Sequence, residues 1–155
     1  RGRKSVARML DHLASIEPTE TTSLVDGVKK FCLRNRGRGV VVLITDLLDK
    51  SGYDAALRYL VGQRLDAYVI QVLSQEEIDP AMVGDLKLLD CEDDDFAEIT
   101  VSRPLLDRYK RTLDAFTAGA QEFCSKRGLN YLLAHNELPV KTLLTNYMRR
   151  RGLVR

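Results

Sequence analysis

An unbroken apolar run, Val40 to Ile44, constrains the fold of this chain more than any other feature. A strand with one face in water alternates apolar and polar residues, whereas this run contains no polar side chain. The run therefore predicts a central, parallel strand that is covered on both faces, as in α/β proteins. Thr45 and Asp46 follow it directly. Because ligands of open α/β sheets bind beyond the carboxyl ends of the strands, we expect Asp46 to lie at a binding edge.

The segments around this run predict further α/β units. Apolar residues at helical spacing predict a helix over 53–63, and an apolar strand follows at 67–73. A strand, a helix and a strand in this order form the βαβ unit of parallel sheets. Two further strands, 86–91 and 96–101, flank an acidic turn and predict an inserted β-hairpin. A long helix capped by Ser102 and ended by Gly128, a strand over 129–134 and a helix from Pro139 complete the pattern.

Length and composition are those of one globular domain, since 155 residues with 45% hydrophobic content can bury a core. The net charge of +2 gives no reason to expect nucleic acid, although arginines cluster at both ends and in the loop 34–38. The three cysteines are widely spaced, which suggests a reducing compartment. No apolar run approaches the roughly 18 residues that cross a bilayer. We expect a cytoplasmic chain without a membrane segment, cut from a longer protein that could be anchored upstream of Arg1.

Few residues are candidates for catalysis. His12 and His135 lie in no motif with a serine or cysteine nucleophile, and the glycines form no phosphate-binding loop. The oxygen-bearing side chains are better candidates, because hydroxyls and carboxylates are the ligands that Mg²⁺ and Mn²⁺ prefer. They are Thr21, Thr22, Ser23, Thr45, Asp46 and Asp49. On the residues alone, a helix cap at Thr22 and a strand-end turn at Asp46 are the preferred interpretation.

Several motifs, taken in order, resemble one family. Thr22-Ser23-Leu24 followed by Val41-Val42-Leu43-Ile44-Thr45-Asp46 is similar to the second half of a von Willebrand factor type A domain. The likeness is closest to the bacterial branch catalogued as domain of unknown function fifty-eight. The motifs that carry it are Gly52-Tyr53-Asp54-Ala55-Ala56-Leu57-Arg58, Asp79-Pro80, Gly84-Asp85-Leu86-Lys87-Leu88-Leu89-Asp90, Tyr109, Cys124-Ser125-Lys126-Arg127-Gly128 and Arg149-Arg150-Arg151-Gly152-Leu153-Val154.

The resemblance implies a Rossmann-like, mostly parallel sheet flanked by helices, with a metal-ion-dependent adhesion site at its carboxyl edge. In the family an Asp-x-Ser-x-Ser loop, a threonine and an aspartate form that site. Thr22 matches the threonine, with Thr21 a weaker alternative, and Asp46 matches the aspartate. The Asp-x-Ser-x-Ser loop is absent, so residues 1–155 are expected to form a partial domain without its first strands. Mg²⁺ or Mn²⁺ is expected in the full-length domain and weak or absent binding in this chain.

The resemblance further implies a protein-interaction module without enzymatic activity, acting with a MoxR-type AAA+ ATPase in chaperone-like assembly or maturation. Self-association through an exposed edge of the Val40–Ile44 strand is also expected. Two alternatives stay open. One is a metal-dependent α/β hydrolase that uses Asp46 with Asp49 and Glu76, and the other is a nucleic-acid binder that uses the arginine clusters on one face.

Overall fold

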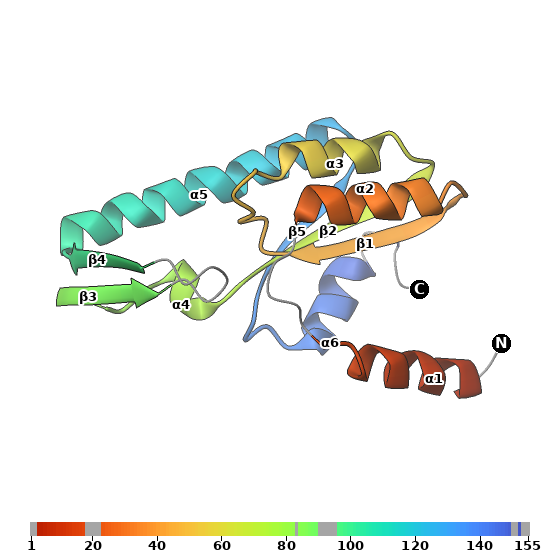
Figure 1. The fold of residues 1–155 in the computed structure, drawn as a ribbon, viewed down its shortest axis with the longest axis horizontal. Helices are drawn as coiled ribbons and strands as arrows, with labels where there is room; N and C mark the ends of the chain where they lie inside the picture. Colours follow the sequence, from red (N-terminus) through yellow and green to blue (C-terminus); the bar gives the residue numbers. More distant parts are fainter. Residues whose placement is uncertain (1–2, 18–22, 83, 90–95, 150–151, 153–155) are drawn as a thin grey trace.

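A three-stranded parallel sheet in the order β1-β2-β5 organises the chain (Figure 1). The computed structural model of the protein describes residues 3–17, 23–82, 84–89, 96–149 and 152. The strands are β1 Gly39–Thr45, β2 Leu65–Leu73 and β5 Asn130–His135. The register sets Thr45 of β1 opposite Gln71 of β2. This arrangement confirms the predicted α/β class with a parallel sheet flanked by helices.

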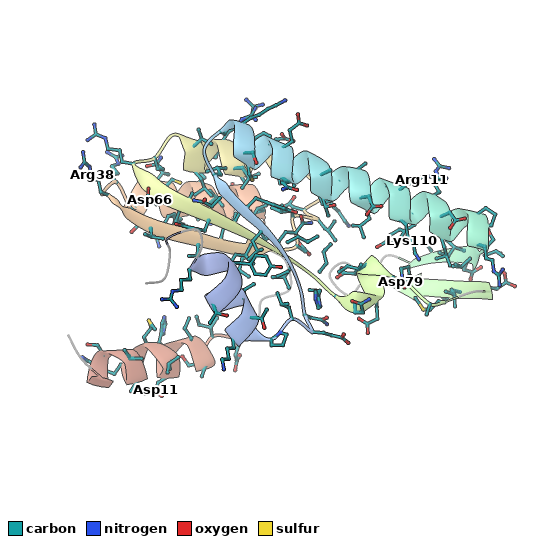
Figure 2. All side chains as sticks on the ribbon, turned by 180° about the vertical axis from the view of Figure 1, so that it is seen from behind. Asp11, Arg38, Asp66, Asp79, Lys110 and Arg111 are labelled. Carbon is teal, nitrogen blue, oxygen red and sulfur yellow. The ribbon has the colours of Figure 1, made fainter. Side chains whose placement is uncertain are left out.

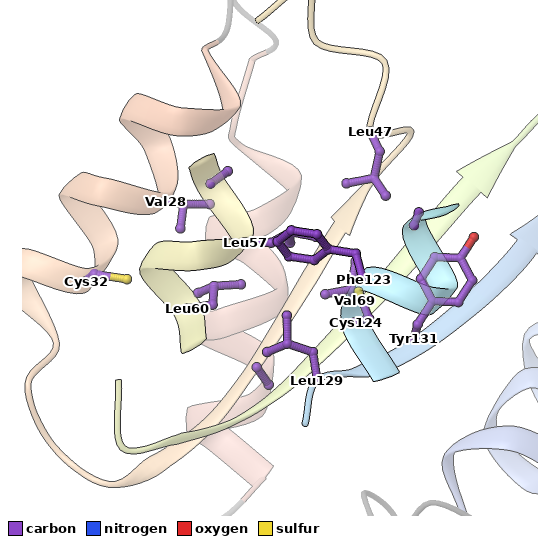
Figure 3. Packing of buried hydrophobic residues seen from close by; sticks show 13 residues of the cluster. Val28, Cys32, Leu47, Leu57, Leu60, Val69, Phe123, Cys124, Leu129 and Tyr131 are labelled. Carbon is purple, nitrogen blue, oxygen red and sulfur yellow. The ribbon is translucent and has the colours of Figure 1, made fainter. Parts of the chain in front are cut away.

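Three helices pack on one face of the sheet and enclose the core. They are α2 Leu24–Arg34, α3 Asp54–Val61 and the C-terminal part of α5 Arg103–Lys126 (Figure 1). Figure 3 shows Leu57 of α3, Phe123 of α5 and Val69 of β2 in one buried cluster. Burying a side chain of this size stabilises the fold by roughly 1.5–3 kcal/mol, so the cluster fixes the helices on the sheet.

The opposite face is covered only in part. The short helix α6 Val140–Thr142 and the π-helix η1 Leu143–Met148 lie on this side, and Tyr147 lines a cavity together with Tyr68 of β2 and Leu132 of β5. The helix α1 Arg3–Ala14 lies beyond them (Figure 1). Its apolar side chains are exposed: Val6, Met9, Leu10, Leu13 and, just after the helix, Ile16.

The expectation that the apolar run is a central strand covered on both faces is wrong for the described sheet. β1 lies at the edge of the sheet, and its outward side chains Val40, Val42 and Ile44 are 53%, 40% and 67% exposed. The reason is that η1 covers β2 and β5, where Ile70 and Ala134 are buried, while no described element covers β1 on this face.

The inserted hairpin is confirmed. β3 Gly84–Leu89 pairs in antiparallel fashion with β4 Phe96–Val101, and the short helix α4 Gln75–Ile78 precedes it. The acidic turn and Cys91 lie outside the described residues.

Helix α5 ends as its sequence predicts. Gly128 has a φ of +73°, which favours glycine, and Leu129 N–H donates to the Cys124 carbonyl at 3.0 Å, a Schellman-type end. The helical spacing of the apolar residues in α5 predicts a buried face that consists of Leu105, Tyr109, Leu113, Phe116, Ala120 and Phe123. This prediction is correct for Phe116, Ala120 and Phe123. It is wrong for Leu105 and Tyr109, which are exposed because the N-terminal half of α5 extends past the sheet toward the hairpin (Figure 1).

Among the described residues, no helix combines the length and the apolar character that a bilayer crossing requires.

Candidate functional site at the carboxyl edge of the sheet

Asp46 follows the last residue of β1 and is exposed at the carboxyl edge of the sheet, where the sequence places it. Thr22, the second predicted site residue, lies outside the described residues, as does its alternative Thr21. The described part of the edge brings Asp46 and its loop together with the start of α2, because Asp49 in that loop contacts Leu24.

The Asp46 carboxylate has one engaged and one available oxygen. Oδ1 accepts the Leu48 N–H at 3.0 Å, which closes a turn of the type that aspartate favours after a strand. The Thr45 hydroxyl lies 3.5 Å from the same oxygen and accepts the Leu47 N–H at 3.1 Å. Oδ2 has no hydrogen-bond partner among the described residues, so this oxygen is available to a ligand at the edge.

The backbone after Asp46 is strained. Leu47 has a φ of +66°, a conformation that costs a residue with a Cβ on the order of 1 kcal/mol. Its side chain is buried in the core cluster shown in Figure 3, which compensates for this cost. The burial of Leu47 therefore holds the loop in the conformation that turns Asp46 outward.

A buried hydrogen-bond chain supports the same loop from below. Nε2 of Gln71 donates to the Asp46 carbonyl at 2.8 Å, and the Tyr131 hydroxyl donates to Oε1 of Gln71 at 2.6 Å. Gln71 is 0% exposed. Burial raises the pKa of Tyr131 to about 12, so its hydroxyl keeps its proton and remains a donor. Gln71 and Tyr131 were missed at the sequence level, although a glutamine inside an apolar strand was a usable signal.

Asp49 has a structural role in the loop. Its Oδ1 accepts the hydroxyl and the N–H of Ser51 at 2.6 and 2.7 Å, and its Oδ2 accepts the Leu24 N–H at 2.7 Å. The Ser51 hydroxyl, followed by the two backbone donors, lowers the pKa of Asp49 below its usual value. Both oxygens accept hydrogen bonds, so Asp49 joins the loop to the first turn of α2. A negative charge is favourable at this position because it lies at the positive end of the helix dipole.

The start of α2 is capped by a second group. The Ser23 side chain accepts the Asp26 N–H at 3.2 Å, so the helix begins at Leu24 with two of its first N–H groups satisfied. The sequence predicted the cap at Thr22, whereas the N-cap residue is Ser23, because the helix begins one residue later, at Leu24.

The donor chemistry of the edge fits a hard, largely hydrated cation rather than a closed metal cage. Asp46 Oδ2 is a carboxylate oxygen of the kind that binds Mg²⁺ directly or through water. In the part of the chain that the structure describes, no cluster of three or more histidine, cysteine, aspartate or glutamate side chains is arranged to hold a metal. Among the described residues, a cation here would depend on Asp46 and on water.

The hydrolase alternative would use further residues of the carboxyl edge, and the structure gives each of them a definite environment. Asp49 is occupied by its hydrogen bonds, and Glu76 belongs to α4 after β2. His135 ends β5, and its Nδ1 is buried without a hydrogen-bond partner among the described residues. Among the described residues, the Ser15 hydroxyl donates to the backbone carbonyl of His12, and we observe no hydrogen bond that joins a hydroxyl or thiol to either imidazole ring.

A parallel sheet flanked by helices, with a carboxylate exposed beyond a strand end, defines an α/β domain of the Rossmann-like class. Residues 1–118 match the family described as protein of unknown function DUF58. The match covers most of the chain, and the protein belongs to this family. Searches of curated proteins and of solved structures gave no match.

Proposed function

We propose that the protein is a von Willebrand A-like interaction module that binds a partner protein through a divalent cation held at Asp46. The observation that carries the proposal is the geometry of Asp46, whose Oδ1 is engaged by the Leu48 N–H while Oδ2 is available at the carboxyl edge. Thr22 is proposed as a further ligand on the resemblance of its motif alone. The family match is compatible with this function without specifying it.

The proposed chemistry is recognition without bond cleavage. A Mg²⁺ or Mn²⁺ ion, when bound, supplies a Lewis-acid position for a carboxylate of the partner. Asp46 orients waters of the ion, Thr45 and Leu47 hold the Asp46 loop, and neutral hydroxyls such as Thr22 leave the ion electron-poor. We therefore propose that the protein is not an enzyme; the support is an exposed carboxylate at the described edge beside which the described residues position no nucleophile.

The proposed partner is a MoxR-type AAA+ ATPase, and the proposed role is chaperone-like assembly or maturation. Both come from the resemblance to the von Willebrand A-like branch. This role fits the proposed chemistry, in which the exposed carboxyl edge of the sheet binds and releases a carboxylate of the partner and no bond is broken.

The test is a binding assay between the full-length protein and a purified MoxR-type ATPase from the same genome, read by biolayer interferometry. Binding is expected with Mg²⁺ and is lost with a chelator. Asp46→Ala should remove it, whereas Asp66→Ala should not, because Asp66 is an exposed carboxylate at the amino end of β2 (Figure 2). Binding that is equal with Mg²⁺ and with chelator would refute the metal-dependent mechanism.

A further inference from the structure

The end of the sheet opposite Asp46 carries a cleft between two helix ends. Its volume is about 470 Å³, and it lies where α2 ends and where the turn from α3 leads into β2. The charged residues that line it are Lys29, Arg36 and Arg64, with Leu33 and Tyr59 among the less polar ones. We call these five residues the basic cleft.

The positive charge of the basic cleft is not neutralised within the described structure. None of the ion pairs among the described residues involves Lys29, Arg36 or Arg64, and the described lining contains no acidic side chain. Asp66 is near in sequence, but it precedes Ala67, whose side chain is buried in the core, so it points to the other face of the sheet.

Cations at helix ends often serve only to balance the helix dipole. Here the positive charge of the cleft is larger than the charge of the dipoles. Each helix C-terminus is equivalent to about half a negative charge, so the ends of α2 and α3 together supply about one. The three cations of the basic cleft exceed this by about two charges. The surplus is available to an external anion.

The basic cleft also has exposed apolar surface. Leu33 is 59% exposed and Tyr59 is 40% exposed. The two helices that carry them are held together, since the Cys32 thiol contacts the Tyr59 carbonyl at 3.7 Å and is itself buried. The packing of α2 on α3 therefore holds the two helix backbones in place before any ligand binds, which lowers the entropic cost of binding.

The surplus charge and the apolar side chains together indicate the type of ligand. Helix C-termini present carbonyl groups, so the cleft lacks the N–H donors that bind phosphate at helix N-termini. Guanidinium groups beside apolar side chains match carboxylates that alternate with apolar residues. We propose that the basic cleft binds an acidic, partly apolar segment of a partner protein, at a site separate from Asp46 and independent of metal.

The test is fluorescence anisotropy of a fluorescein-labelled peptide that repeats Glu-Glu-Leu, titrated with the full chain at low salt in the presence of a chelator. The double variant Arg36→Glu/Arg64→Glu is compared with Arg108→Glu/Arg111→Glu, which makes the same charge change at exposed positions of α5. The cleft variant should bind about tenfold more weakly than wild type, and the α5 variant should bind nearly as wild type does.

Two further arms complete the test. Leu33→Ser should weaken binding about threefold without any charge change, since the apolar contact is lost. Circular dichroism verifies that each variant is folded, and the conclusion then rests on the folded ones. Absence of peptide binding by wild type, equal losses in the two double variants, or tighter cleft-dependent binding of a poly-dT oligonucleotide than of the peptide would each overturn the proposal.

Discussion

The Tyr131 hydroxyl donates a 2.6 Å hydrogen bond to Oε1 of Gln71, and through Gln71 it supports the backbone carbonyl of Asp46. This chain of contacts crosses all three strands of the parallel sheet, from β5 through β2 to the end of β1. The position of the candidate ligand Asp46 thus depends on two buried polar residues that belong to other strands.

Breaking this chain should cost stability in a coupled way. Tyr131→Phe leaves Oε1 of Gln71 without its donor and should destabilise the fold by about 1–3 kcal/mol. Gln71→Leu leaves the Asp46 carbonyl and the Tyr131 hydroxyl unpaired and should cost more. Because the residues share one hydrogen bond, the double variant should cost less than the sum of the two by about 1 kcal/mol in urea unfolding. Simple additivity of the two losses would show that the bond contributes nothing.

The Asp49 contacts predict a dependence of stability on acid. The pKa of Asp49 is lowered in the folded state, so its contribution is complete above the unfolded value of about 3.9 and is lost as the pH falls through the folded value. Asp49→Asn should be less stable than wild type at neutral pH by on the order of 1 kcal/mol.

The difference between wild type and Asp49→Asn should shrink as the pH falls below about 4, measured by urea unfolding across the acid range. Asp114→Asn, at an exposed position of α5, serves as the control and should show little difference at any pH. A gap between wild type and Asp49→Asn that stays constant down to low pH would contradict a charged role for Asp49.

Two glycines of the α5 region should respond in opposite directions to alanine. Gly128→Ala places a Cβ on a residue with φ of +73° and should destabilise by about 1 kcal/mol. Gly119 lies inside the helix, and a Cβ there would make only an ordinary 3.6 Å contact with the Tyr53 hydroxyl. Gly119→Ala should therefore stabilise by about 0.5–1 kcal/mol. Thermal unfolding of the two variants compares the effects directly, and a shift of the same sign in both would be inconsistent with this reading of the helix end.

The uncovered face of β1 predicts self-association. Val42 is 40% exposed on the edge strand, where unpaired backbone groups also favour association. Val42→Lys should shift the chain toward monomer in sedimentation velocity at high concentration. Val61→Lys makes the same change at a 41% exposed position of α3 and should leave association unchanged. If wild type is already monomeric at high concentration, the β1 face is not an association surface.

The sequence predicted the order of the helices and strands better than it predicted which of their faces are buried. The βαβ order, the hairpin and the end of α5 at Gly128 were predictable because turn chemistry and periodicity are local properties. The open face of β1 was not predictable from the sequence. An apolar run shows that a strand can be buried, but it does not show which element covers the strand.

The candidate site was predictable only in its most local part. Asp46 was found because a carboxylate after a buried strand is a local signal. The roles of Asp49, Gln71 and Tyr131 depend on contacts between residues 25 to 60 positions apart, which no local pattern encodes. The positive φ of Leu47 had no signal at all, since leucine is not a residue that favours this conformation.

The most direct test of the proposed function is calorimetric titration of the full-length protein with Mg²⁺, in wild type, Asp46→Ala and Asp66→Ala. Asp46→Ala should cost little stability, because an exposed strand-end carboxylate contributes little to packing. We expect wild type and Asp66→Ala to bind Mg²⁺ alike and Asp46→Ala to lose the binding. Equal Mg²⁺ affinity in wild type and Asp46→Ala would contradict this expectation and leave Asp46 as the end of a strand.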